Sequence, residues 1–183
     1  AQRAGFSSVK INVVVQQGVN VQEVLPLAER FRFTGIVLRF IEYMDVGTLN
    51  QWDRSQVFSS RALIAHISAK YPLRPATPQY RGEVAARYVY EDGGGEIGVI
   101  SSVTQPFCGD CTRLRLSSDG KFYTCLFAQE GADVRALLRA GADDAAIENF
   151  IANLWRERSD RYSEERAGLA VQRPKVEMYH VGG

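Results

Sequence analysis

The sequence predicts an α/β fold, and three consecutive patterns indicate this class. Residues 8–18, SVKINVVVQQG, form an apolar, β-branched run of strand length, and residues 36–44, IVLRFIEYM, form a second one. Between them, residues 19–35 place apolar side chains at helical spacing. Strand, helix and strand make a βαβ unit, whose parallel strands normally belong to a larger covered sheet. Because the chain begins AQRAGF without a methionine and two strands leave a sheet open, we expect it to be a piece of a longer protein.

The later elements are predicted from local signals in chain order. Asn20 is the expected N-cap of the first helix and Gly35 its end, and Ser59 or Ser60 is expected to cap the second. A linker or long loop is predicted over 73–82, because this stretch holds two of the six prolines. Glycine-rich and Asp-Gly turns predict strand pairs over 84–101 and 113–127, the second turning at Asp119-Gly120. Two helices, 132–141 and 143–168, and an extended tail complete the prediction.

Composition excludes several classes of protein. The net charge of +1 argues against a generally basic nucleic-acid binder, so no nucleic-acid partner is expected. No uninterrupted apolar run approaches the roughly 20 residues that span a bilayer, and no membrane partner is expected. No secretory signal pattern opens the chain, so a cytoplasmic location is expected.

All three cysteines lie in one stretch, CGDCTRLRLSSDGKFYTC, as Cys108, Cys111 and Cys125. An odd count does not suit a disulfide framework, and the predicted hairpin can return Cys125 to the Cys-x-x-Cys loop. Four interpretations compete, namely buried inert thiols, a redox dithiol, structural zinc and an iron–sulfur cluster. A redox pair leaves Cys125 unexplained. Zinc needs a fourth ligand, and the only histidines, His66 and His180, are distant in sequence.

Spacing therefore favours a 4Fe–4S cluster, whose usual ligands are thiolates. Three cysteines leave one iron without a protein ligand, and an open iron can act as a Lewis acid toward a substrate. Arg113 and Arg115 lie two apart in the predicted hairpin strand, so their side chains are expected on one face. Paired guanidinium groups suit phosphate oxygens, although two solvated surface charges are the simpler alternative.

The segment CGDCTRLRLSSDGKFYTCLF closely resembles the C-terminal cluster motif of the molybdenum cofactor biosynthesis protein A family, the GTP 3′,8-cyclases. VKINVVVQQGVN, LRFIEYMDVG and the terminal GG match this family in the same order, so the resemblance covers essentially the whole chain. It implies the last βα units of an incomplete parallel, TIM-like radical SAM barrel over 1–47. It also implies a mixed α/β iron–sulfur, GTP-binding domain over 48–183.

The resemblance also implies an activity. Members are radical S-adenosylmethionine enzymes, in which an N-terminal 4Fe–4S cluster on a Cys-x3-Cys-x2-Cys loop generates a 5′-deoxyadenosyl radical from S-adenosylmethionine. A second 4Fe–4S cluster binds GTP, which is converted to 3′,8-cyclo-7,8-dihydroGTP. Cyclic pyranopterin monophosphate synthase is the expected pathway partner, and a homodimer is compatible with the resemblance.

Site residues follow position by position from the resemblance. Cys108, Cys111 and Cys125 resemble the ligands of the second cluster. Contacts to GTP are implied for Lys10, Arg113, Leu114 and Arg115, with Arg39 as an additional positive charge. Met44 resembles a residue of the S-adenosylmethionine pocket, although a lone methionine is more often core. Gly182 and Gly183 resemble a catalytic double glycine, although a terminal GG is commonly a frayed end.

The sequence also departs from the family pattern. It contains no Cys-x3-Cys-x2-Cys, so we do not expect this chain alone to cleave S-adenosylmethionine. WRERSDRYSEE lacks the expected Lys-Pro-x-x-His pattern. Two other functions stay open at this point: a non-catalytic iron–sulfur module that binds nucleotide, and the C-terminal domain of a peptide-maturing radical enzyme.

Overall fold

The computed structural model describes residues 1–168 and 175–180, so the predicted Gly182 and Gly183 lie outside the described residues. The chain divides into two compact units. Unit 1 comprises Ala1–Met44 and Trp52–Asp110, and unit 2 comprises Asp45–Gln51 and the chain from Cys111 onward. Within the described residues, no helix is long and apolar enough to cross a membrane.

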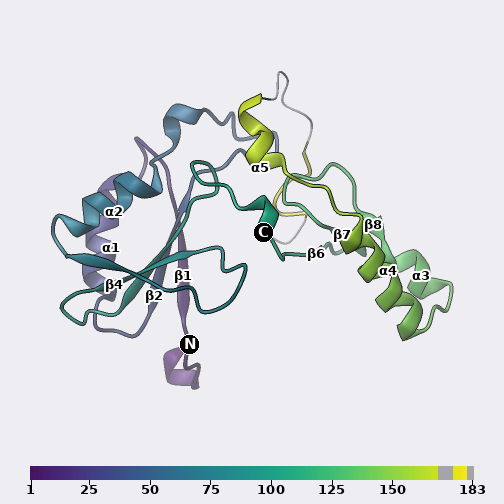
Figure 1. The fold of residues 1–183 in the computed structure, drawn as a ribbon, viewed down its shortest axis with the longest axis horizontal. Coiled ribbons are helices and arrows are strands. Elements are labelled where there is room, and N and C mark those ends of the chain that lie inside the picture. Colours follow the sequence, from purple (N-terminus) through teal and green to yellow (C-terminus); the bar gives the residue numbers. More distant parts are fainter. Residues whose placement is uncertain (169–174, 181–183) are drawn as a thin grey trace. The chain divides into compact units, whose positions relative to one another are not determined.

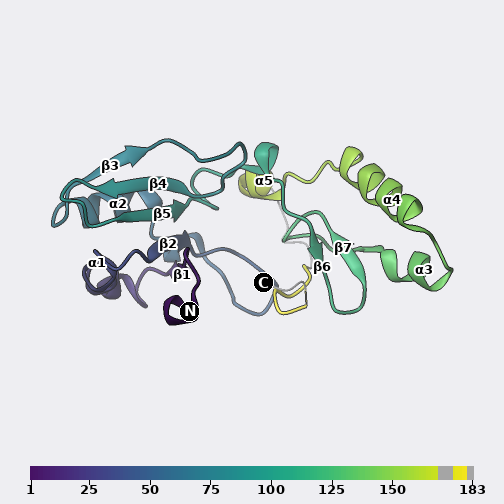
Figure 2. The same cartoon turned by 90° about the horizontal axis from the view of Figure 1, so that it is seen from below.

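Unit 1 contains a five-stranded mixed sheet in the order β1-β2-β5-β4-β3 (Figure 2). The predicted βαβ unit is confirmed, because β1 and β2 are parallel; β5 then extends the parallel part on the other side of β2. The strands β4 and β3 add an antiparallel pair at the far edge. The strand bounds are Lys10–Val15 for β1, Val37–Glu42 for β2, Leu73–Ala76 for β3, Ala86–Tyr90 for β4 and Glu96–Ile100 for β5.

Two helices cover one face of this sheet. Helix α1, Val24–Phe31, contributes the buried residues Val24 and Ala28, and α2, Ser60–Ser68, contributes Leu63 and Ile67. These side chains share a core with Leu38 and Phe40 of β2. Because side chains alternate along a strand, the opposite face carries Lys10 and Arg39. The short 3-10 helices of unit 1 are η1 Gln2–Ala4, η2 Val21–Glu23, η3 Arg54–Gln56 and η4 Cys108–Asp110.

The Ser59 cap of α2 was confirmed. The Asn20 prediction was right in position only, because Asn20 is the N-cap residue of η2, which runs directly into α1, but its side chain makes no capping hydrogen bond. The Ser59 hydroxyl accepts a hydrogen bond from the Ala62 backbone N–H at 3.2 Å, as a cap should. The Asn20 side chain instead accepts from the Gln16 N–H and donates to the Val14 carbonyl, both at 2.9 Å. It therefore closes the turn after β1. Helix α1 also ends at Phe31, and Gly35, with φ of 73°, lies in the turn before β2.

The predicted linker over 73–82 was wrong in its first half, which forms β3. Pro75 pairs in register with Tyr88 of β4, and among the described residues β3 is an edge strand of the sheet. An edge strand tolerates proline, because the missing N–H removes no bond to a second neighbour. The glycine-rich turn between β4 and β5 is as predicted.

Unit 2 contains a three-stranded sheet, β6-β7-β8, and three α-helices in its described part (Figure 1). The predicted hairpin is confirmed, with Gly120 at φ of 79° in the turn between β6 and β7. The predicted helix over 143–168 was wrong as one element, because α4 ends at Arg156 and α5 begins at Tyr162. The bounds are β6 Arg115–Leu116, β7 Lys121–Tyr123, β8 Ala132–Asp133, α3 Val134–Arg139, α4 Asp144–Arg156, α5 Tyr162–Glu165 and η5 Arg166–Gly168.

The mixed α/β class is confirmed, whereas the barrel and the domain boundary after residue 47 remain predictions. The sheet of unit 1 continues beyond that boundary, since β5 pairs with β2 and brings β4 and β3 with it. Near the predicted boundary, only the short segment Asp45–Gln51 belongs to unit 2, and the chain returns to unit 1 at Trp52.

Glu42, the last residue of β2, is a buried carboxylate that organises unit 1. Its oxygens accept hydrogen bonds from the backbone N–H groups of Ser60, Val103 and Thr104 at 2.7–2.9 Å. The Thr104 hydroxyl adds a fourth at 2.5 Å. Burial opposes ionisation, but these donors outweigh it and hold the pKa of Glu42 below its usual value. One carboxylate thus joins the first turn of α2 to the loop that follows β5.

We expect Glu42→Gln to destabilise the protein at neutral pH by roughly 1–3 kcal/mol, because the backbone donors lose a charged acceptor. The folded-state pKa is lowered, so this stabilisation is present above the unfolded value of about 4.3 and is lost as pH falls below it. Denaturant unfolding at pH 7 and at pH 3.5 measures the difference. Glu29→Gln, at an exposed ion pair with Lys70, is the control. An equal loss at both pH values would contradict the assignment.

Candidate functional site

The three cysteines are thiols in the structure and lie on both sides of the division between the units. Cys108 begins η4 near the end of unit 1 and is half-buried. Cys111 is the first residue of the second part of unit 2 and is buried, and Cys125 is half-buried just after β7. Cys111 precedes β6 and Cys125 follows β7, so they lie at the two ends of the hairpin, and the return of Cys125 to the Cys-x-x-Cys loop stays a prediction.

Cys111 is surrounded by positive charge. Its Sγ accepts a hydrogen bond from Arg113 Nε at 3.4 Å, and its carbonyl accepts one from Arg158 Nη1 at 3.1 Å. Burial opposes ionisation of the thiol, but Arg113 and the charge of Arg158 outweigh it and lower the pKa of Cys111. The thiolate is the form that binds metal, so this environment suits a ligand.

Arg158 and Asp160 connect the segments that carry Cys111 and Cys125. Besides its bond to the Cys111 carbonyl, Arg158 approaches Asp160 Oδ2 through Nε at 3.6 Å. The same Asp160 oxygen accepts a hydrogen bond from the Thr124 hydroxyl at 2.5 Å. Sequence reasoning missed this network because it placed both residues inside one helix. The available signal was Ser159-Asp160, a pair of residue types that favours helix ends and turns.

Arg113 lies against the Cys111 sulfur, and Arg115 lies near the thiols of Cys111 and Cys125, but the two arginines are not both on one strand as predicted. Arg115 begins β6, whereas Arg113 precedes the strand. Burial and the nearby charge of Arg113 lower the pKa of Arg115, while the thiols of Cys111 and Cys125 act in the opposite direction. Two guanidinium groups that affect each other's ionisation repel each other, and a nearby anion would relieve the repulsion. Leu114, between them in sequence, is half-buried.

The remaining predicted residues belong to unit 1. Lys10 is exposed at the start of β1, and Arg39 is half-buried on β2, paired in register with Asn12. Lys10 and Arg39 therefore lie on the sheet face that α1 and α2 leave uncovered. Met44 is half-buried and follows the end of β2.

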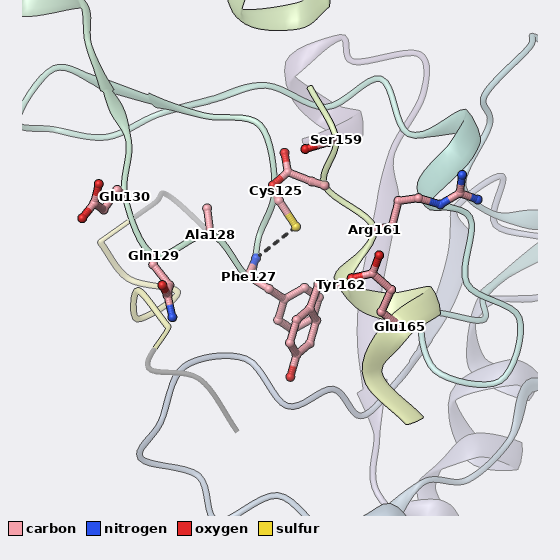
Figure 3. Close-up of a pocket in the computed structure, with 10 residues that line it drawn as sticks. Cys125, Phe127, Ala128, Gln129, Glu130, Ser159, Arg161, Tyr162 and Glu165 are labelled. Carbon is pink, nitrogen blue, oxygen red and sulfur yellow. Dashed lines mark hydrogen bonds between the residues drawn. The ribbon is translucent and has the colours of Figure 1, made fainter. Parts of the chain in front are cut away.

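A pocket of about 560 Å³ in unit 2 has Cys125 in its wall (Figure 3). The Cys125 sulfur accepts a hydrogen bond from the Phe127 N–H at 3.4 Å, and the Phe127 ring stacks on Tyr162 with centroids 4.5 Å apart. Its charged lining residues are Glu130, Asp160, Arg161 and Glu165. Three carboxylates outnumber one guanidinium, so this pocket repels a triphosphate, and phosphate binding fits the side of Arg113 and Arg115.

The donor set fits an iron–sulfur cluster better than a single metal ion. Among the described residues, no group of three or more His, Cys, Asp or Glu side chains is arranged to hold a metal ion. A 4Fe–4S cluster distributes thiolates over separate irons, so its ligands need not meet at one point. Thiol chemistry at Cys111 and Cys125, with cations beside them, is compatible with such a cluster. Convergence of all three cysteines remains a prediction.

The comparisons with known proteins all point to one family. Residues 36–164 match the family described as Molybdenum Cofactor Synthesis C. The GTP 3′,8-cyclase of Xanthomonas campestris pv. campestris (strain B100) is 50% identical over 183 residues, 100% of this chain and 53% of the relative. That of Acidothermus cellulolyticus is 52% identical over 171 residues, 91% of this chain and 47% of the relative. That of Synechococcus sp. (strain WH7803) is 46% identical over 187 residues, 100% of this chain and 53% of the relative.

These matches confirm the resemblance found from the cysteine–arginine motif. The chain spans about half the length of the curated relatives it matches. The family match includes all three cysteines, both arginines, and Arg158 with Asp160. The chain belongs to the Molybdenum Cofactor Synthesis C family.

Proposed function

We propose that this chain forms the GTP-binding, cluster-holding part of a GTP 3′,8-cyclase that makes 3′,8-cyclo-7,8-dihydroGTP in molybdenum cofactor biosynthesis. The observation that carries this proposal is the hydrogen bond of Arg113 to the Cys111 sulfur, with Arg115 near the thiols of Cys111 and Cys125. An anion-binding pair next to thiolates suits a nucleotide held at an iron–sulfur cluster. The names of the relatives support GTP as that nucleotide.

Cys108, Cys111 and Cys125 would hold the cluster. A 4Fe–4S cluster with one iron lacking a protein ligand supplies a Lewis-acid position for substrate. Arg113 favours the thiolate form of Cys111 through its hydrogen bond to the sulfur, and the Phe127 N–H donates to the Cys125 sulfur. Each of these two sulfurs therefore accepts a hydrogen bond from the protein itself, which favours its thiolate form.

The arginines and lysine would orient GTP. Arg113 and Arg115 present planar donors that match phosphate oxygens bidentately, and Leu114 lies in the same GTP-contacting segment. Lys10 and Arg39 contribute positive charge on the uncovered face of the sheet in unit 1, and we assign them to the same ligand. That uncovered face supports the proposal that β1 and β2 belong to a parallel barrel of TIM-like type, with this face inside.

The remaining roles concern the intact enzyme. Met44 would contact S-adenosylmethionine, Gly182 and Gly183 would act in the active site, and the radical-generating cluster would lie outside this chain. We therefore expect this chain alone to be inactive. We further propose that the intact enzyme is cytoplasmic and passes its product to cyclic pyranopterin monophosphate synthase. A homodimer is compatible with this proposal.

Anaerobic reconstitution with iron and sulfide tests the central claim. We expect about four irons per chain and a reduced-state spin-resonance spectrum that GTP perturbs, because a three-cysteine cluster leaves one iron open. Cys125→Ala should lose iron. Bound zinc without sulfide, or unchanged iron in Cys125→Ala, would reject the cluster. A spectrum indifferent to GTP, combined with binding of a peptide, would favour a peptide-maturing enzyme.

Substitution of the two arginines tests the phosphate assignment. Arg113→Gln and Arg115→Gln should each weaken the binding of GTP by roughly 1–3 kcal/mol, because each removes a charged hydrogen bond to phosphate. The binding of guanosine, which has no phosphate, should be weakened much less. Arg135→Gln in α3, at an exposed ion pair with Asp133, is the control. Equal losses for GTP and guanosine would place the phosphates elsewhere.

Arg158 should hold the cysteine segments in position for the cluster. In Arg158→Met the Cys111 carbonyl loses its donor and Asp160 loses its ion pair. Loss of such an outer-sphere contact typically lowers metal affinity by about 10–100-fold, so we expect faster iron release to a chelator. Arg156→Met, two residues earlier on an exposed position of α4, is the matched control. The same release rate in both variants would contradict the role.

A further inference from the structure

Asp45 is the centre of a buried ionic junction that the proposed chemistry does not use. Its Oδ2 lies 2.6 Å from Lys175 Nζ, which also donates to the Asp45 carbonyl at 2.7 Å. Its Oδ1 lies 2.8 Å from Arg166 Nε, and the Tyr162 hydroxyl donates to Oδ2 at 2.5 Å. The Asp45 and Lys175 side chains are only 3% and 2% exposed. All four residues belong to unit 2, and they join three separate segments of it.

A second contact lies next to the first and joins two of the same segments. Glu177 Oε1 accepts hydrogen bonds from the Thr48 N–H at 2.8 Å and from the Thr48 hydroxyl at 2.9 Å. Gly47 has φ of 69°, and a Cβ built there would lie 2.0 Å from Glu177 Oε2. The backbone conformation therefore favours glycine at this position, and a side chain here would push the Glu177 carboxylate away from Thr48.

The buried charges of this junction are suited to hold one segment of the chain in a fixed position against another. A buried ion pair often adds little stability compared with apolar side chains of similar size, but it accepts few alternative geometries. Here the charges are enclosed by aromatic rings, with Lys175 Nζ 4.7 Å from the Tyr162 ring centroid and 5.5 Å from that of Phe127. Segment 175–177 is thus held at two successive points by segment 45–48.

We propose that residues 45–48 and 175–177 form a latch that positions the chain leading to Gly182 and Gly183 for the reaction. Asp45 and Lys175 are its positioning residues, and Thr48 and Glu177 provide the second point. The latch itself consists of the contacts described above. Its purpose rests on the proposed function, in which the two glycines act in the active site.

Hydrogen exchange followed by mass spectrometry tests the latch directly in the intact protein, without cluster or substrate. Lys175→Met keeps the aliphatic stem and leaves Asp45 paired with Arg166 and Tyr162, so it is preferable to Asp45→Asn, which leaves two buried cations. We expect exchange in 175–180 to rise at least about tenfold, because a buried charged hydrogen bond is lost. Lys175→Arg should restore much of the protection. Lys70→Met, at an exposed ion pair, is the matched control. Unchanged exchange in Lys175→Met would overturn the latch.

A double-mutant cycle on turnover of the intact enzyme tests its purpose. Lys175→Met should lower kcat toward the level of a variant lacking Gly182 and Gly183, and combining the two changes should cause little further loss. Multiplying losses would indicate a merely structural contact and overturn the positioning role. If deletion of the glycines leaves kcat unchanged, their proposed catalytic role fails, and with it the purpose of the latch. The exchange measurement still decides whether the latch itself exists.

Discussion

Two buried carboxylates, at the end of β2 and just beyond it, are the constraint on which both units depend. Glu42 gathers backbone donors from the first turn of α2 and from the loop after β5. Asp45, three residues later, gathers Lys175, Arg166 and Tyr162 in unit 2. A buried charge is tolerated only where partners are supplied, so each carboxylate fixes the segments that supply them. One short stretch of sequence therefore organises two separate groups of loops.

The segments with proposed roles follow the carboxyl ends of parallel strands. Met44 follows β2, and the loop that begins after β5 leads to Cys108. In parallel α/β sheets, ligands bind at this edge, because the loops there converge while the strands provide a rigid base. Glu42 is bonded to the loop after β5, so the base of the segment that carries the first cysteine is fixed within unit 1.

The positive charge of the arginines near the cysteines bears on both the thiolate form of Cys111 and the proposed binding of phosphate. Arg113 favours the Cys111 thiolate, and together with Arg115 it supplies the positive charge on which the proposed phosphate site rests. The neighbouring pocket behind Cys125 carries the opposite charge through Glu130, Asp160 and Glu165. The proposed phosphate site and this acidic pocket thus differ in charge, which favours an anion on the arginine side. Arg158 connects this electrostatic arrangement to the fold through Asp160 and Thr124.

The sequence by itself determined the features that depend on neighbouring residues. These include the parallel β1 and β2, the Ser59 cap, the turn at Gly120 and the family to which the cysteine–arginine motif belongs. Only the tertiary structure decided the pairing of β2 with β5, the strand at Pro75, and the contacts of Arg158 and Asp45. Arg158 is 47 residues from Cys111, and Lys175 is 130 residues from Asp45. Local periodicity and capping signals carry no information about such partners, because these charges become buried and paired only once distant segments pack together.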